Sequence, residues 1–217
     1  MTTRLTRSLA LLFLFLAAAL ACQFSAAETP TPKPGQVLFQ DEFSDPLSGW
    51  NRVSAADGLT DYADGVYRIL VNRPNLDIWS KPGLDFSDVR LEVDSFKVSQ
   101  ERDNRFGLIC RALDATHFYT FMISSDGYFA VGKVMDAQYA LVDMPNMQPS
   151  EFIRLGSDLN HLRADCIGDA LTFYVNGHKL ITVHDDEYMF GDVGLIAGTY
   201  DTPGTDVRFD NLTVQAP

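Results

Sequence analysis

The sequence predicts an all-β protein built as a sandwich of two antiparallel sheets. Short runs of aromatic and β-branched residues recur about a dozen times, and Gly, Asn, Asp and Pro occupy the turns between them. Several of these runs alternate apolar and polar residues, as half-buried strands do. Beyond the N-terminal segment, no run of ten or more residues has the 3.6-residue period of a helix.

Residues 1–21 are predicted to be a signal peptide. Arg4 and Arg7 precede an uncharged apolar run at 9–20, which is too short to span a bilayer comfortably. Small residues lead up to Cys22, as at a bacterial lipoprotein cleavage site, so Cys22 is the predicted lipidated residue. This places the protein on a bacterial cell surface or a periplasm-facing membrane, with the lipid as its only membrane contact. The alternative is ordinary secretion with cleavage near Ala27.

Residues 22–36 are rich in proline and poor in apolar groups, which predicts an extended tether. Residues 37–217 then suffice for one sandwich domain with a sizeable core. Loss of the signal peptide changes the formal net charge from −12 to −14, because that segment holds two arginines and no acid. An acidic chain without a basic cluster is not expected to bind nucleic acid.

The first half of the domain should contain four strands, the last of which has an amphipathic pattern. The expected strands cover residues 37–43, 66–71, 76–80 and 87–98. In the last of these, Val89, Leu91 and Val93 occupy one face, and the polar residues between them occupy the other. This strand should therefore place one face on the core and one face in solvent.

The centre of the domain is a three-strand meander at 106–111, 118–124 and 128–134. A turn at Ser125-Asp126-Gly127 joins the last two strands. Because the second strand is apolar or aromatic on both faces, either both faces are covered or one carries rings that stack on a ligand.

The last part of the domain should begin with an irregular loop at 136–151. The strands expected after it cover residues 152–155, 161–167, 171–175, 178–183, 193–199 and 206–214. Asn176-Gly177 is the strongest hairpin signal in the chain and favours a type I′ turn.

Cys110 and Cys166 remain once Cys22 is assigned to the anchor, and their spacing suits no zinc site. In an exported protein an even pair favours a disulfide, here between two predicted strands. The alternative is two buried free thiols that act as small apolar residues.

The order of several short motifs resembles the concanavalin A-like lectin and glucanase superfamily over about residues 37–215. These motifs are Asp41-Glu42-Phe43-Ser44, Gly49-Trp50, Asp64-Gly65-Val66-Tyr67, Phe106-Gly107-Leu108-Ile109-Cys110-Arg111, Tyr174-Val175-Asn176-Gly177 and Phe209-Asp210-Asn211-Leu212-Thr213-Val214. Within the superfamily, the chain is most similar to laminin-G-like domains and to the bacterial 3-keto-disaccharide hydrolase-type domain. The resemblance implies a two-sheet jelly roll, a fold whose members differ widely in function.

The glucanases of this superfamily carry Glu-x-Asp-x-x-Glu on one strand, and the outer two carboxyl groups perform the hydrolysis. The corresponding residues here are Glu92, Asp94 and Lys97. Because Lys97 cannot act as the second carboxyl group, glucanase chemistry is not expected, and no catalytic residue can be carried over from the keto-disaccharide hydrolases.

The resemblance also implies a structural calcium between the chain termini, although no cofactor is required. Asp41 and Asp210 are its candidate ligands, together with backbone carbonyls. The alternative is that both aspartates only hydrogen-bond to turns.

Aromatic side chains near polar ones are the residues expected at a sugar site, because a pyranose has one apolar face and hydroxyl groups at its edges. The candidates are Trp79, Arg111, Tyr119, Asp126, Tyr128 and Tyr139. The alternative is that these rings are ordinary core or rim residues.

Three functions follow from these observations. The first is a surface-anchored, non-catalytic module that binds a glycan, a cell-envelope polymer or another extracellular ligand. The second is a glycoside-processing hydrolase of the keto-disaccharide type, and the third is a purely structural or adhesion domain of the envelope. The interrupted carboxylate triplet favours the first and the third.

Overall fold

A computed structural model of the chain describes residues 31–217, which contain strands, turns and loops but no helix. The compact unit extends from Lys33 to Pro217. The predicted signal peptide and the lipidation site at Cys22 lie outside the described residues. Among the residues described, no helix has the length and apolar character needed to cross a membrane.

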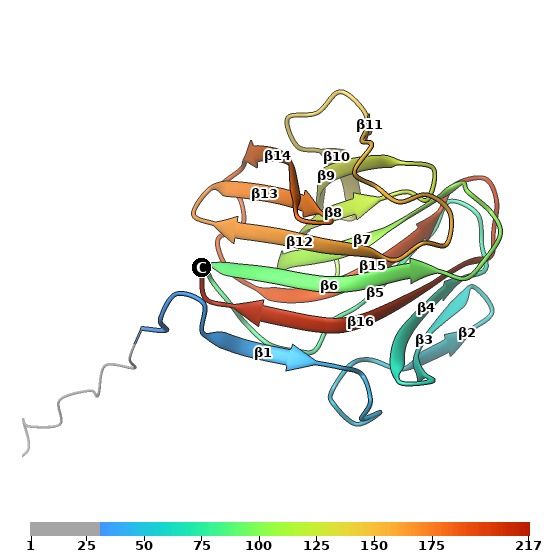
Figure 1. Cartoon of the computed structure of the whole chain (residues 1–217), viewed down its shortest axis with the longest axis horizontal. Coiled ribbons are helices and arrows are strands. Elements are labelled where there is room, and N and C mark those ends of the chain that lie inside the picture. The colour runs from blue at the N-terminus through green and yellow to red at the C-terminus, as the bar shows by residue number, and fades with distance from the viewer. Residues whose placement is uncertain (1–30) are drawn as a thin grey trace, which may run out of the picture. The chain divides into compact units, whose positions relative to one another are not determined.

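Two antiparallel sheets form the two layers of the domain (Figure 1). Sheet A has nine strands, in the order β14 (His178–His184), β13 (Ala170–Val175), β12 (Asn160–Ile167), β6 (Val89–Lys97), β16 (Thr205–Gln215), β4 (Val66–Val71), β3 (Gly58–Ala63) and β2 (Val53–Ala55), with β1 (Val37–Asp41) paired to β16. Sheet B has seven strands, in the order β10 (Gln138–Leu141), β9 (Tyr128–Met135), β8 (Phe118–Ile123), β7 (Asn104–Ala112), β15 (Asp192–Thr199) and β5 (Asp77–Ser80), with β11 (Gln148–Pro149) paired to β9. The predicted two-sheet jelly-roll sandwich is confirmed.

Alternation along each strand sends one set of side chains between the sheets. In β6 the predicted inward residues Val89, Leu91 and Val93 are buried, and the residues between them are partly exposed. Phe121 of sheet B meets Phe173 of sheet A at a ring-centroid distance of 5.7 Å. Contacts of this kind join the two layers into one core.

A second apolar cluster lies on the other side of sheet B. Its buried members are Ile109, Ala112, Phe118, Met122 and Ile196, and Trp79 and Val134 pack against them. The meander is therefore apolar on both faces, as its sequence predicted, and the outer apolar face lies next to a candidate site described below.

The Cys110–Cys166 disulfide joins β7 of sheet B to β12 of sheet A. Both cysteines are completely buried. The predicted bridge is thus confirmed and is a link between the sheets.

Turn chemistry fixes the β13–β14 hairpin. Asn176 and Gly177 have φ values of 52° and 82°, the left-handed region that a type I′ turn requires at both central residues. The prediction from the sequence is correct here.

Three local predictions were wrong. The expected irregular loop at 136–151 contains β10 and β11, which extend sheet B beyond β9. Residues 152–155 lie in a turn and an irregular segment in place of the expected strand, with Ile153 N–H donating to the Ser150 carbonyl at 3.4 Å. The last tether residues also belong to the fold, because Gly35 N–H donates to the Ala216 carbonyl at 2.8 Å.

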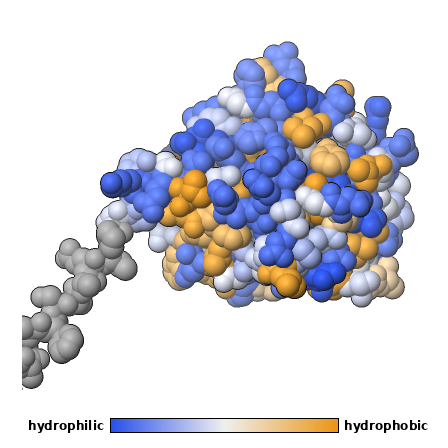
Figure 2. Space-filling model, turned by 60° about the horizontal axis from the view of Figure 1, so that its bottom comes forward, coloured by the Kyte–Doolittle hydropathy of each residue, from blue (hydrophilic) through white to orange (hydrophobic). Residues whose placement is uncertain are grey.

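One face of the molecule carries both polar and apolar side chains (Figure 2). On the face shown in Figure 2, hydrophobic patches are small and hydrophilic side chains separate them.

Candidate functional site

The structure separates the six candidate sugar-binding residues into two groups. Tyr119 and Arg111 are 0 % and 1 % exposed, so neither offers a surface to a ligand. Trp79, Asp126, Tyr128 and Tyr139 are at least partly exposed, and each lines one of two hollows on sheet B. Tyr119 and Arg111 therefore do not share an open surface with Tyr128, and their prediction as sugar-contacting residues is not supported.

Tyr119 and Phe118 are neighbours on β8, so their side chains point to opposite faces of sheet B. Phe118 belongs to the outer cluster, and Tyr119 belongs to the core between the sheets. Its hydroxyl donates to Asp185 and accepts from Tyr188 N–H at 3.1 Å. Asp185 also pairs with Lys133 at 2.6 Å. Burial raises the pKa of Tyr119 well above its ordinary value, so this group ties a loop to the sheet and remains neutral.

Arg111 lies at a left-handed backbone position with φ 53°, near the end of β7. Its guanidinium donates to the Tyr188 carbonyl at 3.0 Å and to Asp88 at 3.2 Å. Burial lowers its pKa, and the carboxylate of Asp88 opposes that shift. Arg111 therefore supports the loop before β15 from beneath.

The first hollow, which we name the aromatic hollow, has a volume of about 200 Å³. Its lining includes Trp79, Phe118, Thr120, Val134, Tyr139 and Ile196. Trp79 and Tyr139 come from β5 and β10, the strands at the two ends of the sheet order. Trp79 extends from its edge to Phe118, with the ring centroids 5.4 Å apart.

Glycine allows the Tyr139 ring to lie close to the sheet. A Cβ atom on Gly132 would be 2.4 Å from the Tyr139 hydroxyl oxygen, so only glycine leaves room for the ring. Although 43 % of the residue is exposed, burial of its hydroxyl over Gly132 raises the pKa of Tyr139 to about 12. The ring is thus an uncharged wall of the aromatic hollow at neutral pH.

Thr120 is the polar group that stands out in the lining of the aromatic hollow. The residue is 0 % exposed, and its hydroxyl, which lies beside the Tyr139 hydroxyl, makes no hydrogen bond of normal geometry with the described residues. Buried hydroxyl groups are normally paired, because an unpaired one has lost its water without replacement. At 0 % exposure the hydroxyl lies beneath the surface of the hollow, so the surface that a ligand can reach is formed by partly exposed residues such as Trp79 and Tyr139.

The second hollow, which we name the polar hollow, has a volume of about 510 Å³. Its lining includes Arg102, Asp103, Asp126, Tyr128, Asn146, Tyr200 and Asp201. Tyr128 is 41 % exposed. The hollow thus combines accessible aromatic rings with charged and amide groups.

Asp77, Arg105 and Tyr200 join the two hollows, since Asp77 lines the first and Tyr200 the second. Arg105 donates two hydrogen bonds to Asp77, at 2.7 and 2.9 Å, and its guanidinium lies 4.4 Å from the Tyr200 ring centroid. The pair meets above Gly198, where a Cβ atom would lie 1.8 Å from Asp77 Oδ1. We call these three residues the junction.

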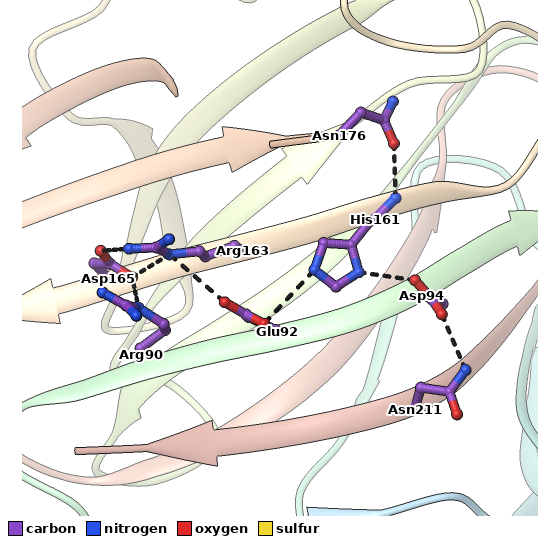
Figure 3. Close-up of polar contacts among 8 residues, drawn as sticks. All are labelled: Arg90, Glu92, Asp94, His161, Arg163, Asp165, Asn176 and Asn211. Carbon is purple, nitrogen blue, oxygen red and sulfur yellow. Dashed lines mark hydrogen bonds and ion pairs between the residues drawn. The ribbon is translucent and has the colours of Figure 1, made fainter. Parts of the chain in front are cut away.

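A different arrangement covers the outer face of sheet A, where polar residues of β6, β12 and β16 form a continuous network (Figure 3). His161 Nδ1 lies 2.8 Å from Asp94 Oδ1, and its Nε2 lies 3.7 Å from Glu92 Oε2. Asn211 donates to the other Asp94 oxygen at 2.9 Å. These carboxylates are held by neighbouring side chains.

Lys97, the third residue of the interrupted triplet, points to the opposite side of β6. It is 2 % exposed and its ammonium donates to the Ser99 and Glu101 carbonyls. Lys97 therefore cannot join Glu92 and Asp94 in glucanase-type hydrolysis.

The two candidate calcium ligands do not gather a ligand set. One Asp41 oxygen accepts from Phe43 N–H at 2.7 Å and the other from the Ser48 hydroxyl at 2.5 Å, while Asp210 accepts from Asn211 N–H at 2.8 Å. Within residues 31–217, no three His, Cys, Asp or Glu side chains are grouped to hold a metal ion. Asp41 and Asp210 alone do not make a metal site, and the structural calcium, which would also need backbone carbonyls, stays a prediction.

Sequence reasoning missed Thr120 and the junction residues Asp77, Arg105 and Tyr200. Glycine within a strand was the available signal, because it often marks a place where another group approaches the backbone closely. Gly132 and Gly198 are two such positions.

Comparison with known proteins by sequence gave no match, either to a family model or to a curated protein. Solved structures match well. Carbohydrate binding module CBM66 from Bacillus subtilis aligns with a TM-score of 0.64 and 19 % identity, over 78 % of this chain and 96 % of that one. The chain has the concanavalin A-like sandwich fold.

Two further structures support this fold assignment. The β-glucanase of Bacillus licheniformis aligns with a TM-score of 0.61 and 11 % identity, over 82 % of this chain and 98 % of the other. A Bacillus subtilis protein of unknown function with a galectin-like fold gives 0.59 and 12 %, over 85 % and 98 %. The narrower resemblance to laminin-G-like and keto-disaccharide hydrolase-type domains stays a prediction.

Proposed function

We propose that this concanavalin A-like domain is a non-catalytic module that binds carbohydrate on the outer face of sheet B. The observation that carries the proposal is a hollow that joins the partly exposed rings of Trp79 and Tyr139 to the polar side chains of Asn75 and Asp77. An aromatic lining with a hydrogen-bonding group matches the two surfaces of a sugar ring, its apolar face and its hydroxyl edge.

The outer face of sheet A does not favour a hydrolytic function. Glu92 and Asp94 are tied to neighbouring side chains, and the next residue of the glucanase pattern is an inward-facing lysine. We therefore propose binding without cleavage.

We further propose that a lipid on Cys22 holds the module on a bacterial envelope membrane. The sequence around Cys22 supports the lipid attachment. The proline-rich segment that follows would hold the domain away from the membrane as an extended tether. Cells fed a labelled fatty acid should label the wild-type chain but not the Cys22→Ser variant. Equal labelling of both would contradict the anchor.

The binding proposal is tested with a glycan array followed by calorimetric titration of the glycans that bind. Trp79→Ala and Tyr139→Ala should each weaken binding by about 2 kcal/mol, roughly thirtyfold in Kd, because each removes a stacking surface. Tyr174→Ala is the matched control, since this ring lies on sheet A and stacks on Arg163 at 4.4 Å. Array silence, or equal losses in all three variants, would contradict the proposal.

A further inference from the structure

A chain of side-chain contacts links the linings of the two hollows on sheet B. Asp77 belongs to the aromatic hollow and is bonded to Arg105, which in turn stacks on Tyr200 in the polar hollow. A ligand that leaves one hollow along this face therefore meets the junction and then the other hollow.

The sizes of the hollows suit different parts of one ligand. Drug-sized ligands occupy pockets that begin at about 300 Å³. The aromatic hollow, at about 200 Å³, suits a single ring, whereas the polar hollow, at about 510 Å³, has room for more. Together they fit a chain better than one isolated sugar.

The charges around the hollows select against acidic ligands. The polar hollow is lined by three carboxylates, those of Asp103, Asp126 and Asp201, and by one guanidinium, that of Arg102. Asp103 is fixed in place because it accepts from Asp201 N–H at 3.0 Å. The whole chain also carries a formal charge of −12, which adds to the negative potential.

The guanidinium at the junction does not compensate for these carboxylates. Arg105 forms a two-bond pair with Asp77, and the Tyr200 ring covers it. Such a fork-to-carboxylate pair uses the geometry by which arginine recognises an incoming carboxylate or sulfate. Arg105 is therefore already neutralised and cannot attract an acidic sugar.

From these observations we infer that the ligand is a chain of at least two sugar units that carries no acidic group, with one unit in the aromatic hollow and the next across the junction. This inference rests on the proposed carbohydrate-binding function and specifies its ligand class.

The test uses purified oligosaccharides of one to six units, as uncharged chains and as the same chains bearing uronic acid or sulfate groups. Titration at low ionic strength should show at least tenfold tighter binding of the uncharged chain than of its acidic counterpart. Affinity should also rise at least tenfold from the single sugar to the short chain, because only the chain reaches both hollows.

A charge variant separates selection by these carboxylates from a general preference. Asp126→Asn combined with Asp201→Asn should reduce the ratio of uncharged to acidic affinity at least threefold. The control is Asp169→Asn, whose carboxylate pairs with His184 at 3.1 Å and lines neither hollow. The melting temperature of each variant establishes that it is folded.

The outcomes distinguish the inferred ligand class from the proposed carbohydrate-binding function. Tighter binding of acidic chains, or a single sugar that binds as well as a chain, would overturn the inference and leave carbohydrate binding intact. If no chain of either kind binds, the proposed function itself fails.

Discussion

The Thr120 hydroxyl separates stability from binding at the scale of one residue. Thr120→Val removes an unpaired buried polar group and should stabilise the free protein by about 1 kcal/mol. The same change should leave glycan binding unchanged, because the hydroxyl is 0 % exposed and a ligand does not reach it. Chemical denaturation and calorimetric titration measure the two effects.

Thr172→Val provides a matched control for that experiment. The Thr172 and Thr182 hydroxyls are hydrogen-bonded to each other at 3.0 Å, so removing one leaves the other without this partner. We expect this variant to be no more stable than the wild type and to bind normally. Stabilisation by both substitutions would contradict the conclusion that the Thr120 hydroxyl differs from a paired one.

The sequence identified the right kind of residue for the site but not which of them are accessible. Tyr119 and Phe118 are neighbours on a strand that is apolar on both faces, and alternation alone cannot say which face is inside. The pairing of Tyr119 with Cys110, whose disulfide lies between the sheets, places it in the core. Trp79 and Tyr139 could be foreseen as aromatic candidates, whereas Thr120 could not.

At the scale of elements, the β9–β10 hairpin should depend on the close contact between Gly132 and Tyr139. Gly132→Ala should push the ring out of its position and bring the Tyr139 pKa down from about 12 toward its ordinary value of 10.0. Spectrophotometric titration of tyrosinate absorbance, with Tyr139→Ala to identify the signal, measures the change.

A double-mutant comparison checks the cause. In a Tyr139→Ala background the added methyl group no longer meets the ring, so Gly132→Ala should cost less stability than it does in the wild type. Equal costs in both backgrounds would mean that the methyl group clashes with something else.

His117 links the loop before β8 to the β9–β10 turn. Its Nδ1 lies 2.9 Å from Asp114 and its Nε2 3.2 Å from Asp136, while the Tyr188 ring meets it edge-on at 6.0 Å. The hydrogen bond with Asp114 raises the pKa of His117 above 6.5, and Asp136 adds to this shift. Ala115 and Ala137, which line the aromatic hollow, lie on the two linked segments.

This link should make stability depend on pH. Because the folded-state pKa of His117 lies above its unfolded value, its contribution is complete below about pH 6.5 and is lost as the pH rises through the folded-state pKa. Relative to wild type, His117→Gln should therefore be most destabilised in acid and least in alkali. Denaturation curves over this range measure the difference.

The NMR-measured pKa of His117 gives an independent check. Asp136→Asn should lower it, and Asp126→Asn, a carboxylate of the polar hollow, should leave it unchanged. An unperturbed His117 pKa in the wild type would remove the link.

The sequence did not predict β10 and β11 because their pattern is weak. Residues 138–141 and 148–149 are short and lack alternation, and Pro149 argues against a strand interior. Both lie at the edge of sheet B, where such segments are tolerated. The long strands were predictable because one of their faces is buried against the opposite sheet.

For the whole molecule, the Cys110–Cys166 disulfide should be a main source of stability. It closes a loop with a sequence separation of 56 residues, for which the chain-entropy model gives about 4 kcal/mol. Cys110→Ala combined with Cys166→Ala should lower the free energy of unfolding by about that amount. Reduced wild-type protein should unfold at the same denaturant concentration as the double variant, and a large difference between them would point to packing effects of the substitutions.

The global fold was the most predictable level, because alternation, turn residues and motif order all indicated the same sandwich. The candidate site was less predictable. It is built by strands that are distant in the sequence, and a glycine within a strand indicates a close approach without identifying the group that approaches.

The pairing of Gly35 and Gln36 with Ala216 continues into the ladder between β1 and β16. A force on the tether therefore acts first on these hydrogen bonds between the start of the domain and β16. If the tether is anchored while the opposite sheet holds a ligand, the load passes from β1 into β16, which β4 and β6 flank. We expect the β1–β16 hydrogen bonds to break before the two sheets separate. Loss of β1 would then leave the sheet that holds the ligand intact.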